Sequence, residues 1–217
     1  MCSSHNKLYN DMSYPEAIKL QEELAKKVIT KDSVSEIKNV CAVDVSYKDD
    51  VAFSSAVVIN KKTMEVVEYI NTQTAVKYPY VPGLLMLREA EPVMSALKLL
   101  KNDFELLLVD GHGQLHPRRC GLACYLGIIL NKPTIGVAKS LLCGTIKENF
   151  VELDGKKLGA VIGNKQKKIF VSVGHKICLK SATKIVTKLI KENEWLPEPL
   201  RVADMNSKHE SKSYISL

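Results

Sequence analysis

A short strand that ends on an acidic residue constrains the fold of this chain more than any other feature. Residues 105–109 are expected to form a largely apolar strand, which is followed by Asp110, a glycine-containing loop, a helix at about 122–130 and a strand at 134–137. A strand, loop, helix and strand in this order are typical of buried parallel strands. The sequence therefore predicts an α/β fold with parallel strands inside its sheet.

Antiparallel strands are expected on both sides of this unit. Three β-rich runs separated by short polar turns predict a meander over residues 40–45, 51–59 and 64–70. After Gly144 the pattern returns to short strands, expected at 150–153, 157–162 and 168–173.

Helices complete the predicted pattern, and apolar periodicity places them at 14–28, 84–91, 92–101 and 181–193. Pro92 is expected to begin a helix of its own, because proline is tolerated at a helix start and disfavoured inside. We expect one domain over residues 1–217: a central mixed sheet, antiparallel meander plus parallel strands, flanked by helices on both faces. The polar segments 1–12 and 206–217 are expected to be flexible.

The class of protein is narrowed by what the chain lacks. No run approaches the roughly 18 apolar residues of a membrane helix, and the start has no apolar stretch typical of a signal peptide. The six cysteines lack the paired short spacings of a zinc site. We therefore expect a monomeric cytoplasmic protein with reduced cysteines and no membrane partner.

The net charge of +7, from 31 Lys and Arg against 24 Asp and Glu, favours a polyanionic partner. A lysine-rich surface also keeps an ordinary protein soluble, so this second interpretation stays open. Only four of the basic residues are arginines, among them Arg88, Arg118 and Arg119. Arginine suits fixed contacts to phosphate or carboxylate, and these three lie close in sequence to acidic candidates.

Two carboxylates are the first candidates for chemistry. Asp44 lies inside an apolar strand, and Asp110 follows the apolar strand described above, at the carboxyl end where open α/β sheets place ligands. An unpaired buried carboxylate is costly, whereas a pair of carboxylates suits Mg²⁺, which also accepts phosphate oxygens. Each aspartate alone is equally well explained as a strand-end cap or a turn residue.

A third acidic candidate and a basic loop accompany this pair. Glu89 lies on an expected helix, where the simpler interpretation is a solvated helix face. Around Asp110, Gly111 and Gly113 allow close approach of a ligand, and His116 and Arg118 add potential cations. Phosphate binding beside a metal explains this combination.

Six motifs in one order resemble the endonuclease V family. They are Ala42-Val43-Asp44-Val45-Ser46-Tyr47, Pro79-Tyr80-Val81-Pro82-Gly83, Leu87-Arg88-Glu89, Val109-Asp110-Gly111-His112-Gly113, His116-Pro117-Arg118-Arg119 and Gly136-Val137-Ala138-Lys139-Ser140. Each motif alone is weak, but together they cover most of the chain.

This resemblance implies a ribonuclease H-like fold and a magnesium-dependent nick in nucleic acid that contains a deaminated base, chiefly hypoxanthine. The cut would fall at the second phosphodiester bond on the 3′ side of the base and leave a 3′-hydroxyl and a 5′-phosphate. Asp44 and Asp110 would hold Mg²⁺, for which Mn²⁺ can substitute, and Glu89 would complete the acidic cluster. Lys139 would contact the scissile phosphate or the attacking water. Asp204 would add to the metal site, where some bacterial relatives carry a histidine.

The resemblance also implies how a displaced base is held. Tyr80 would be a wedge that fills the gap in the base stack. His116, Arg88 and Arg118 would contact nucleic acid, although His116 is also explained as a structural histidine bonded to a loop carbonyl. The lesion pocket would be lined by Gly83, Leu85, Gly111, Gly113, Leu122 and Leu142.

The leading expectation from this resemblance is a DNA repair endonuclease, and three alternatives to it remain open. The same chemistry could act on inosine in RNA, since discrimination of the 2′-hydroxyl depends on contact geometry. The chain could also be a nucleic-acid-binding protein without catalysis, or a ribonuclease H-like hydrolase without preference for a lesion.

Overall fold

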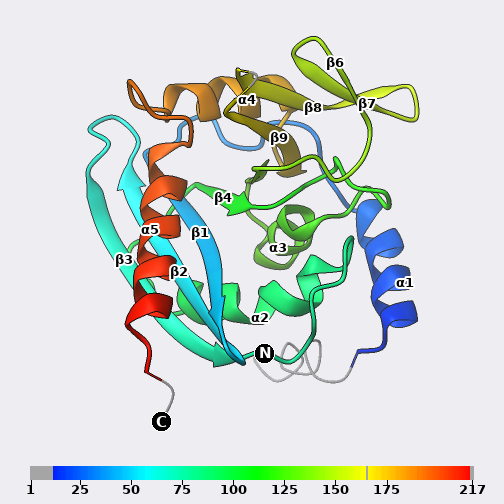
Figure 1. Cartoon of the computed structure of the whole chain (residues 1–217). Coiled ribbons are helices and arrows are strands. Elements are labelled where there is room, and N and C mark those ends of the chain that lie inside the picture. The colour runs from blue at the N-terminus through cyan, green and yellow to red at the C-terminus, as the bar shows by residue number, and fades with distance from the viewer. Residues whose placement is uncertain (1–11, 165, 216–217) are drawn as a thin grey trace.

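One mixed sheet organises the residues that the computed structural model describes, 12–164 and 166–215 (Figure 1). Its nine strands lie in the order β3-β2-β1-β4-β5-β9-β8-β7-β6. They are β1 (Asn39–Lys48), β2 (Val51–Asn60), β3 (Val66–Ala75), β4 (Leu106–Asp110), β5 (Thr134–Ala138), β6 (Thr145–Lys147), β7 (Phe150–Leu153), β8 (Lys156–Gly163) and β9 (Lys168–His175). Strands β1, β4 and β5 run parallel, and the other neighbouring pairs are antiparallel. The predicted α/β fold, a meander joined to parallel strands, is confirmed.

Helices cover both faces of the sheet, as predicted (Figure 1). They are α1 (Tyr14–Ala25), α2 (Leu85–Leu97), α3 (Leu122–Leu130), α4 (Leu179–Lys188) and α5 (Glu198–Ser213). Because side chains alternate along a strand, Cys41 and Val43 of β1 belong to the core that also contains buried residues of α1, α2 and α3. Val40 and Ala42 belong instead to the core on the opposite face, which contains buried residues of α4 and α5. No helix among the described residues is long and apolar enough to cross a membrane.

This alternation positions the two candidate aspartates. Asp44 lies two residues after Ala42, and Asp110 lies two residues after Leu108, so both are expected on the face covered by α5. The register of β1 with β4 pairs Val43 with Val109, which places the following two aspartates next to each other.

The expectation of a flexible tail from residue 206 is wrong for residues 206–213, because α5 continues to Ser213. Ala203, Ser207 and Ser211, spaced four residues apart, are buried on the side of α5 that packs against β1 and β2. Small residues let the helix approach the strands closely, and their low hydrophobicity hides this helix from an apolar pattern. Residues 1–11 of the expected N-terminal tail lie outside the described residues.

Pro92 does not divide the second helical region into two helices. α2 runs through it as one helix, and Pro92 is buried inside. Proline removes one main-chain hydrogen bond, but apolar residues before and after it pack on the sheet and keep both halves in place.

Candidate active site

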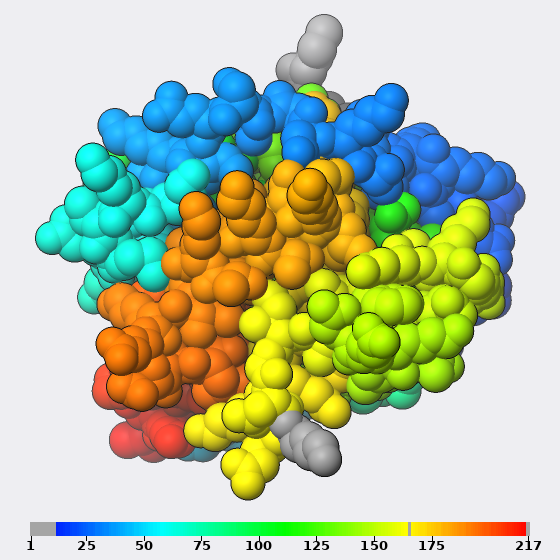
Figure 2. Space-filling view, turned by 90° about the horizontal axis from the view of Figure 1, so that it is seen from above, coloured from blue at the N-terminus to red at the C-terminus, as the bar shows by residue number. Residues whose placement is uncertain are grey.

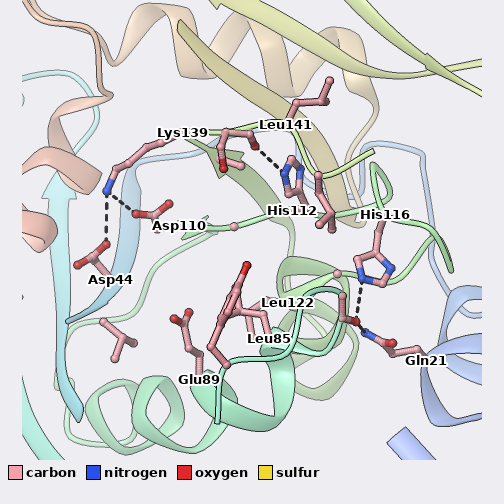
Figure 3. A pocket seen from close by; sticks show the side chains of 18 residues that line it. Gln21, Asp44, Leu85, Glu89, Asp110, His112, His116, Leu122, Lys139 and Leu141 are labelled. Atoms are coloured by element: carbon pink, nitrogen blue, oxygen red, sulfur yellow. Dashed lines mark hydrogen bonds and ion pairs between the residues drawn. The ribbon is translucent and has the colours of Figure 1, made fainter. Parts of the chain in front are cut away.

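Three aspartates converge beside a cavity of about 460 Å³, and two of them, Asp44 and Asp110, line it (Figure 3). Asp44 comes from β1, Asp110 from the end of β4 and Asp204 from α5, and one carboxylate oxygen of each lies within 4.8 Å of the others. Asp44 is only 6% exposed. Carboxylate oxygens this close suit a hard divalent cation, so the donor set fits the predicted magnesium site.

An ammonium group lies among these carboxylates. Lys139 follows β5, and its Nζ lies 2.5 Å from Asp110 Oδ2, 2.6 Å from Asp204 Oδ1 and 3.8 Å from Asp44 Oδ1. Burial lowers the pKa of Lys139, but the charge of Asp110 and hydrogen bonds to Asp110 and Asp204 outweigh burial and raise the pKa above its ordinary value. The cluster therefore already binds a cation, supplied by the chain itself.

Asp44 also accepts a hydrogen bond from a residue that the sequence analysis missed. The Ser207 hydroxyl, fully buried on α5, donates to Asp44 Oδ2 at 2.5 Å. Burial and the neighbouring Asp110 raise the pKa of Asp44 to about 7, while the Ser207 hydrogen bond acts in the opposite direction. α5 thus supplies both a carboxylate and the hydroxyl that orients a second carboxylate.

Glu89 reaches the cavity from the other face of the sheet (Figure 3). It projects from α2 and accepts a hydrogen bond from the Tyr47 hydroxyl at 3.2 Å. Burial raises its pKa well above 4.5, and the charges of Asp110 and Asp44 raise it further. The charges of the aspartate cluster therefore act on Glu89, although Glu89 is not one of the three converging carboxylates.

Five of the six residues predicted for the lesion pocket line this cavity: Gly83, Leu85, Gly111, Leu122 and Leu142. Gly113, the sixth, is not among the lining residues. Its N–H donates to Ser172 Oγ at 2.8 Å, and a Cβ on it would lie 2.0 Å from the Val173 carbonyl oxygen. The structure thus explains a glycine at this position by close packing against β9.

His116 and Arg118 have internal partners. The His116 Nδ1 accepts from the Arg118 backbone N–H at 3.2 Å, so Nε2 carries the proton and donates to the Gly83 carbonyl at 3.0 Å. Burial and the charge of Arg118 lower the pKa of His116 to about 4, which keeps it neutral. Arg118 Nη2 donates to the same carbonyl at 2.6 Å. This geometry favours the structural interpretation of His116.

Gln21, on α1, completes this network. Its Nε2 donates to the carbonyls of Gly83 at 3.1 Å and Cys120 at 2.9 Å, and its Oε1 accepts from Arg118 Nε at 2.7 Å. Gln21 is buried on α1 together with Ala17 and Leu24, and a polar residue among apolar ones is the signal that could have identified it. The Gly83 carbonyl therefore accepts hydrogen bonds from three side chains.

Arg88 holds the other end of the loop that carries Tyr80. Its Nη1 donates to the Tyr78 carbonyl at 2.9 Å, and its guanidinium lies 4.0 Å from the centre of the Tyr47 ring. Tyr80, between the two anchored ends, lines the cavity and is 63% exposed. The two ends of the loop are thus fixed, while the ring of Tyr80 remains exposed to solvent.

Comparison with known proteins agrees with this geometry. The family model of Endonuclease V matches residues 22–205. The chain is 42% identical over 208 residues to Endonuclease V of Thermofilum pendens, covering 92% of this chain and 90% of that protein. It is 40% identical over 189 residues to Endonuclease V of Pyrococcus horikoshii, with coverage of 87% and 82%.

Solved structures show the same similarity. Endonuclease V from Streptomyces avermitilis superposes with a TM-score of 0.86 at 33% identity, covering 93% of this chain and 94% of that one. Ciona intestinalis Endonuclease V, in complex with a 24-mer DNA containing an inosine followed by a ribo-adenosine, has a TM-score of 0.83 at 34% identity, with coverage of 91% and 97%.

Proposed function

The chain belongs to the endonuclease V family, and from this membership and its acidic cavity we propose that it nicks nucleic acid containing deaminated bases, chiefly hypoxanthine. The cut would fall at the second phosphodiester bond 3′ to the lesion, by Mg²⁺-dependent hydrolysis that leaves a 3′-hydroxyl and a 5′-phosphate. The supporting observation is the convergence of Asp44, Asp110 and Asp204 around Lys139, beside a cavity whose lining includes Asp44, Asp110 and Lys139 as well as glycines and leucines.

Asp44 and Asp110 would hold the Mg²⁺ ion, with Asp204 and Glu89 completing the acidic set and Mn²⁺ as a substitute. A bound divalent cation supplies an activated water and stabilises charge on the leaving oxygen. Lys139 would give up its carboxylate partners and offer its ammonium to the scissile phosphate. Ser207 would keep Asp44 oriented throughout.

The cavity volume of about 460 Å³ lies within the range of small-molecule pockets and suits a base turned out of its stack. Leu85, Leu122 and Leu142 would cover its faces, while backbone groups at Gly83 and Gly111 read its edge. Tyr80 would fill the gap in the stack. Arg88, His116 and Arg118 would assist binding by fixing the shape of the Tyr80 loop.

RNA containing inosine is the second candidate substrate. A ribonucleotide follows the inosine in the ligand of the Ciona relative, which favours testing this substrate. The deciding experiment compares nicking of matched deoxyinosine DNA, inosine RNA and the chimeric strand, each with and without Mg²⁺. Equal cutting of a matched strand without inosine would contradict the proposed lesion preference.

Tyr80→Ala should weaken binding to inosine-containing duplex by about 10- to 100-fold, since an aromatic stack on a base contributes ~1–3 kcal/mol. Fluorescence anisotropy with Ca²⁺ in place of Mg²⁺ measures this without cutting. Tyr69→Ala is the matched control, because Tyr69 is 58% exposed on β3, away from the cavity lining. Unchanged affinity of the Tyr80 variant would exclude the wedge role.

Ser207→Ala should weaken Mn²⁺ binding about tenfold, because a hydrogen bond to a charged group contributes ~1.5 kcal/mol. Isothermal titration of the free protein measures the affinity. Ser211→Ala is the control on the same helix, since Ser211 Oγ donates to the Lys208 carbonyl and not to the cluster. Equal affinity in both variants would show that Ser207 does not orient Asp44.

Glu89→Gln should stabilise the cation-free protein increasingly as pH rises. Because burial and the charges of Asp110 and Asp44 raise the pKa of Glu89, the folded state holds this proton more tightly than the unfolded state. The contribution of the Glu89 proton to the stability of the folded protein is complete below pH 4.5, the ordinary pKa of a glutamate, and is lost as pH rises through the folded-state pKa. Glutamine stays neutral, so its contribution does not change with pH.

Thermal unfolding in chelator across this pH range tests the Glu89 prediction. The difference in midpoint between Glu89→Gln and the wild type should grow with pH, and added Mg²⁺ should diminish or reverse it. A difference that stays constant with pH would contradict the prediction.

A further inference from the structure

A second hollow, of about 990 Å³, lies at the opposite end of β1 from the aspartate cluster. Its walls are the loop 32–38, the turn 60–63 between β2 and β3, and one face of α4. Figure 2 shows the face of the molecule on which these segments lie. Lys38 precedes β1, six residues before Asp44, which corresponds to about 20 Å along an extended strand. We call this hollow the lysine groove.

The lysine groove carries more than half of the formal charge excess of the chain. It is lined by Lys38, Lys61, Lys62, Lys176, Lys184 and Lys188. Within the described part of the chain, Asp32 and Glu36 are its only acidic lining residues, which leaves a net charge of +4 against +7 for the whole chain. Among the described residues, none of these six lysines forms an ion pair with an acidic side chain.

Hydrogen bonds between the walls hold the lysine groove open. The Asp32 carboxylate accepts from the Cys178 N–H at 2.8 Å and from Ser181 Oγ at 2.7 Å, so this acid holds the start of α4. Lys61 N donates to the Lys38 carbonyl at 2.8 Å, which joins the turn to the loop. The positive groove is therefore built into the fold and does not require a ligand to form.

The lining chemistry identifies the occupant. None of the described residues that line the groove is an arginine or an aromatic residue, so these residues offer neither a bidentate fork nor a surface for base stacking. Lysines supply point charges on flexible chains, which suit a continuous row of phosphates read without regard to sequence. We propose that the lysine groove binds the sugar–phosphate backbone of nucleic acid at a distance from the cut site.

This inference rests on the proposed function in one respect, because it takes nucleic acid, the proposed substrate, as the ligand of the lysine groove. A short substrate occupies the aspartate cavity alone, whereas a long duplex or a folded RNA can contact both sites. The second contact then becomes intramolecular and raises the overall affinity.

The test neutralises four groove lysines together, in Lys61→Gln/Lys62→Gln/Lys184→Gln/Lys188→Gln. The matched control is Lys98→Gln/Lys101→Gln/Lys156→Gln/Lys212→Gln, which removes the same charge from exposed positions outside the groove. Binding of an inosine-free duplex several helical turns long is measured by anisotropy over a salt series. The groove variant should bind about 10- to 100-fold more weakly at moderate salt, with a log–log salt slope smaller by about 2 to 4.

The nicking rate of a one-turn inosine duplex separates this inference from the proposed function. The groove variant should cut it like the wild type, and if neither protein cuts it, the proposed function fails while the binding result still stands. Wild-type binding by the groove variant, or an equal loss in the control variant, would overturn the inference. So would groove-dependent binding of a glutamate-rich peptide combined with unchanged duplex binding, which would identify an acidic protein partner.

Discussion

Asp110→Asn should abolish nicking, with a single-turnover rate at least about 10³-fold below the wild type. Asp110 ends β4, converges with Asp44 and Asp204, and lies 2.5 Å from the ammonium of Lys139. An amide keeps the shape of the side chain but removes its charge, and a cation in such a site contributes several kcal/mol of transition-state stabilisation. Mn²⁺ titration of the same variant should show a parallel loss of affinity.

Two controls make the Asp110 result specific. Asp103→Asn removes an acid that pairs with Lys132 at 2.8 Å, and its side chain is 85% exposed, so its rate should match the wild type. Binding of inosine duplex in Ca²⁺-free buffer should persist in Asp110→Asn, because the wedge and pocket remain. If Asp110→Asn cuts at the wild-type rate, the active site lies elsewhere in the protein, and the assignment of this cavity as the active site is wrong.

Local patterns were sufficient to predict the centre of the fold and two of the three converging aspartates. A β-loop-α-β order predicts parallel pairing of β4 with β5, and a carboxylate inside or at the end of a buried apolar strand is costly enough to mark a candidate site. Asp44 and Asp110 were therefore predictable from their positions in strands. The meander was predictable for the same reason, since each strand neighbours the next along the chain.

The contribution of α5 was not predictable from such patterns. Its buried side is made of small residues such as Ala203 and Ser207, so the sequence shows no apolar stripe. Asp204 came from the family resemblance alone, and the hydrogen bond between Ser207 and Asp44 joins residues 163 positions apart. Contacts over such separations depend on how the helix docks, which periodicity within one segment does not encode.

A count of charged residues also does not show where they lie in the folded protein or which of them are paired. Arg88 and Arg118 are expected from sequence to contact nucleic acid, yet both donate hydrogen bonds to backbone carbonyls of the Tyr80 loop. Six of the 27 lysines lie together in one groove, brought there from segments around residues 38, 61 and 184. Composition favours a polyanionic partner, but which charges stay unneutralised is decided by tertiary neighbours.

Lys139→Met should change cation affinity and activity in opposite directions. In the free protein the ammonium contacts Asp110 at 2.5 Å and Asp204 at 2.6 Å, so an incoming cation must displace it. Removing this competitor should tighten Mn²⁺ binding about 10- to 100-fold, since a hydrogen bond to a charged group contributes ~1.5–3 kcal/mol. The nicking rate should nevertheless fall about 10²- to 10³-fold, as expected when one preorganised donor to the phosphate is lost.

Isothermal titration with Mn²⁺ and single-turnover nicking of the same Lys139→Met sample separate the two effects. Lys147→Met is the matched control, because Lys147 pairs with Glu152 at 2.8 Å in the β6–β7 hairpin and contacts none of the three aspartates. If Lys139→Met weakens Mn²⁺ binding along with activity, the ammonium organises the carboxylates and does not compete for their site. Tighter binding with slower cutting would instead establish that Lys139 holds the site in the free protein and acts on the phosphate once the cation has entered.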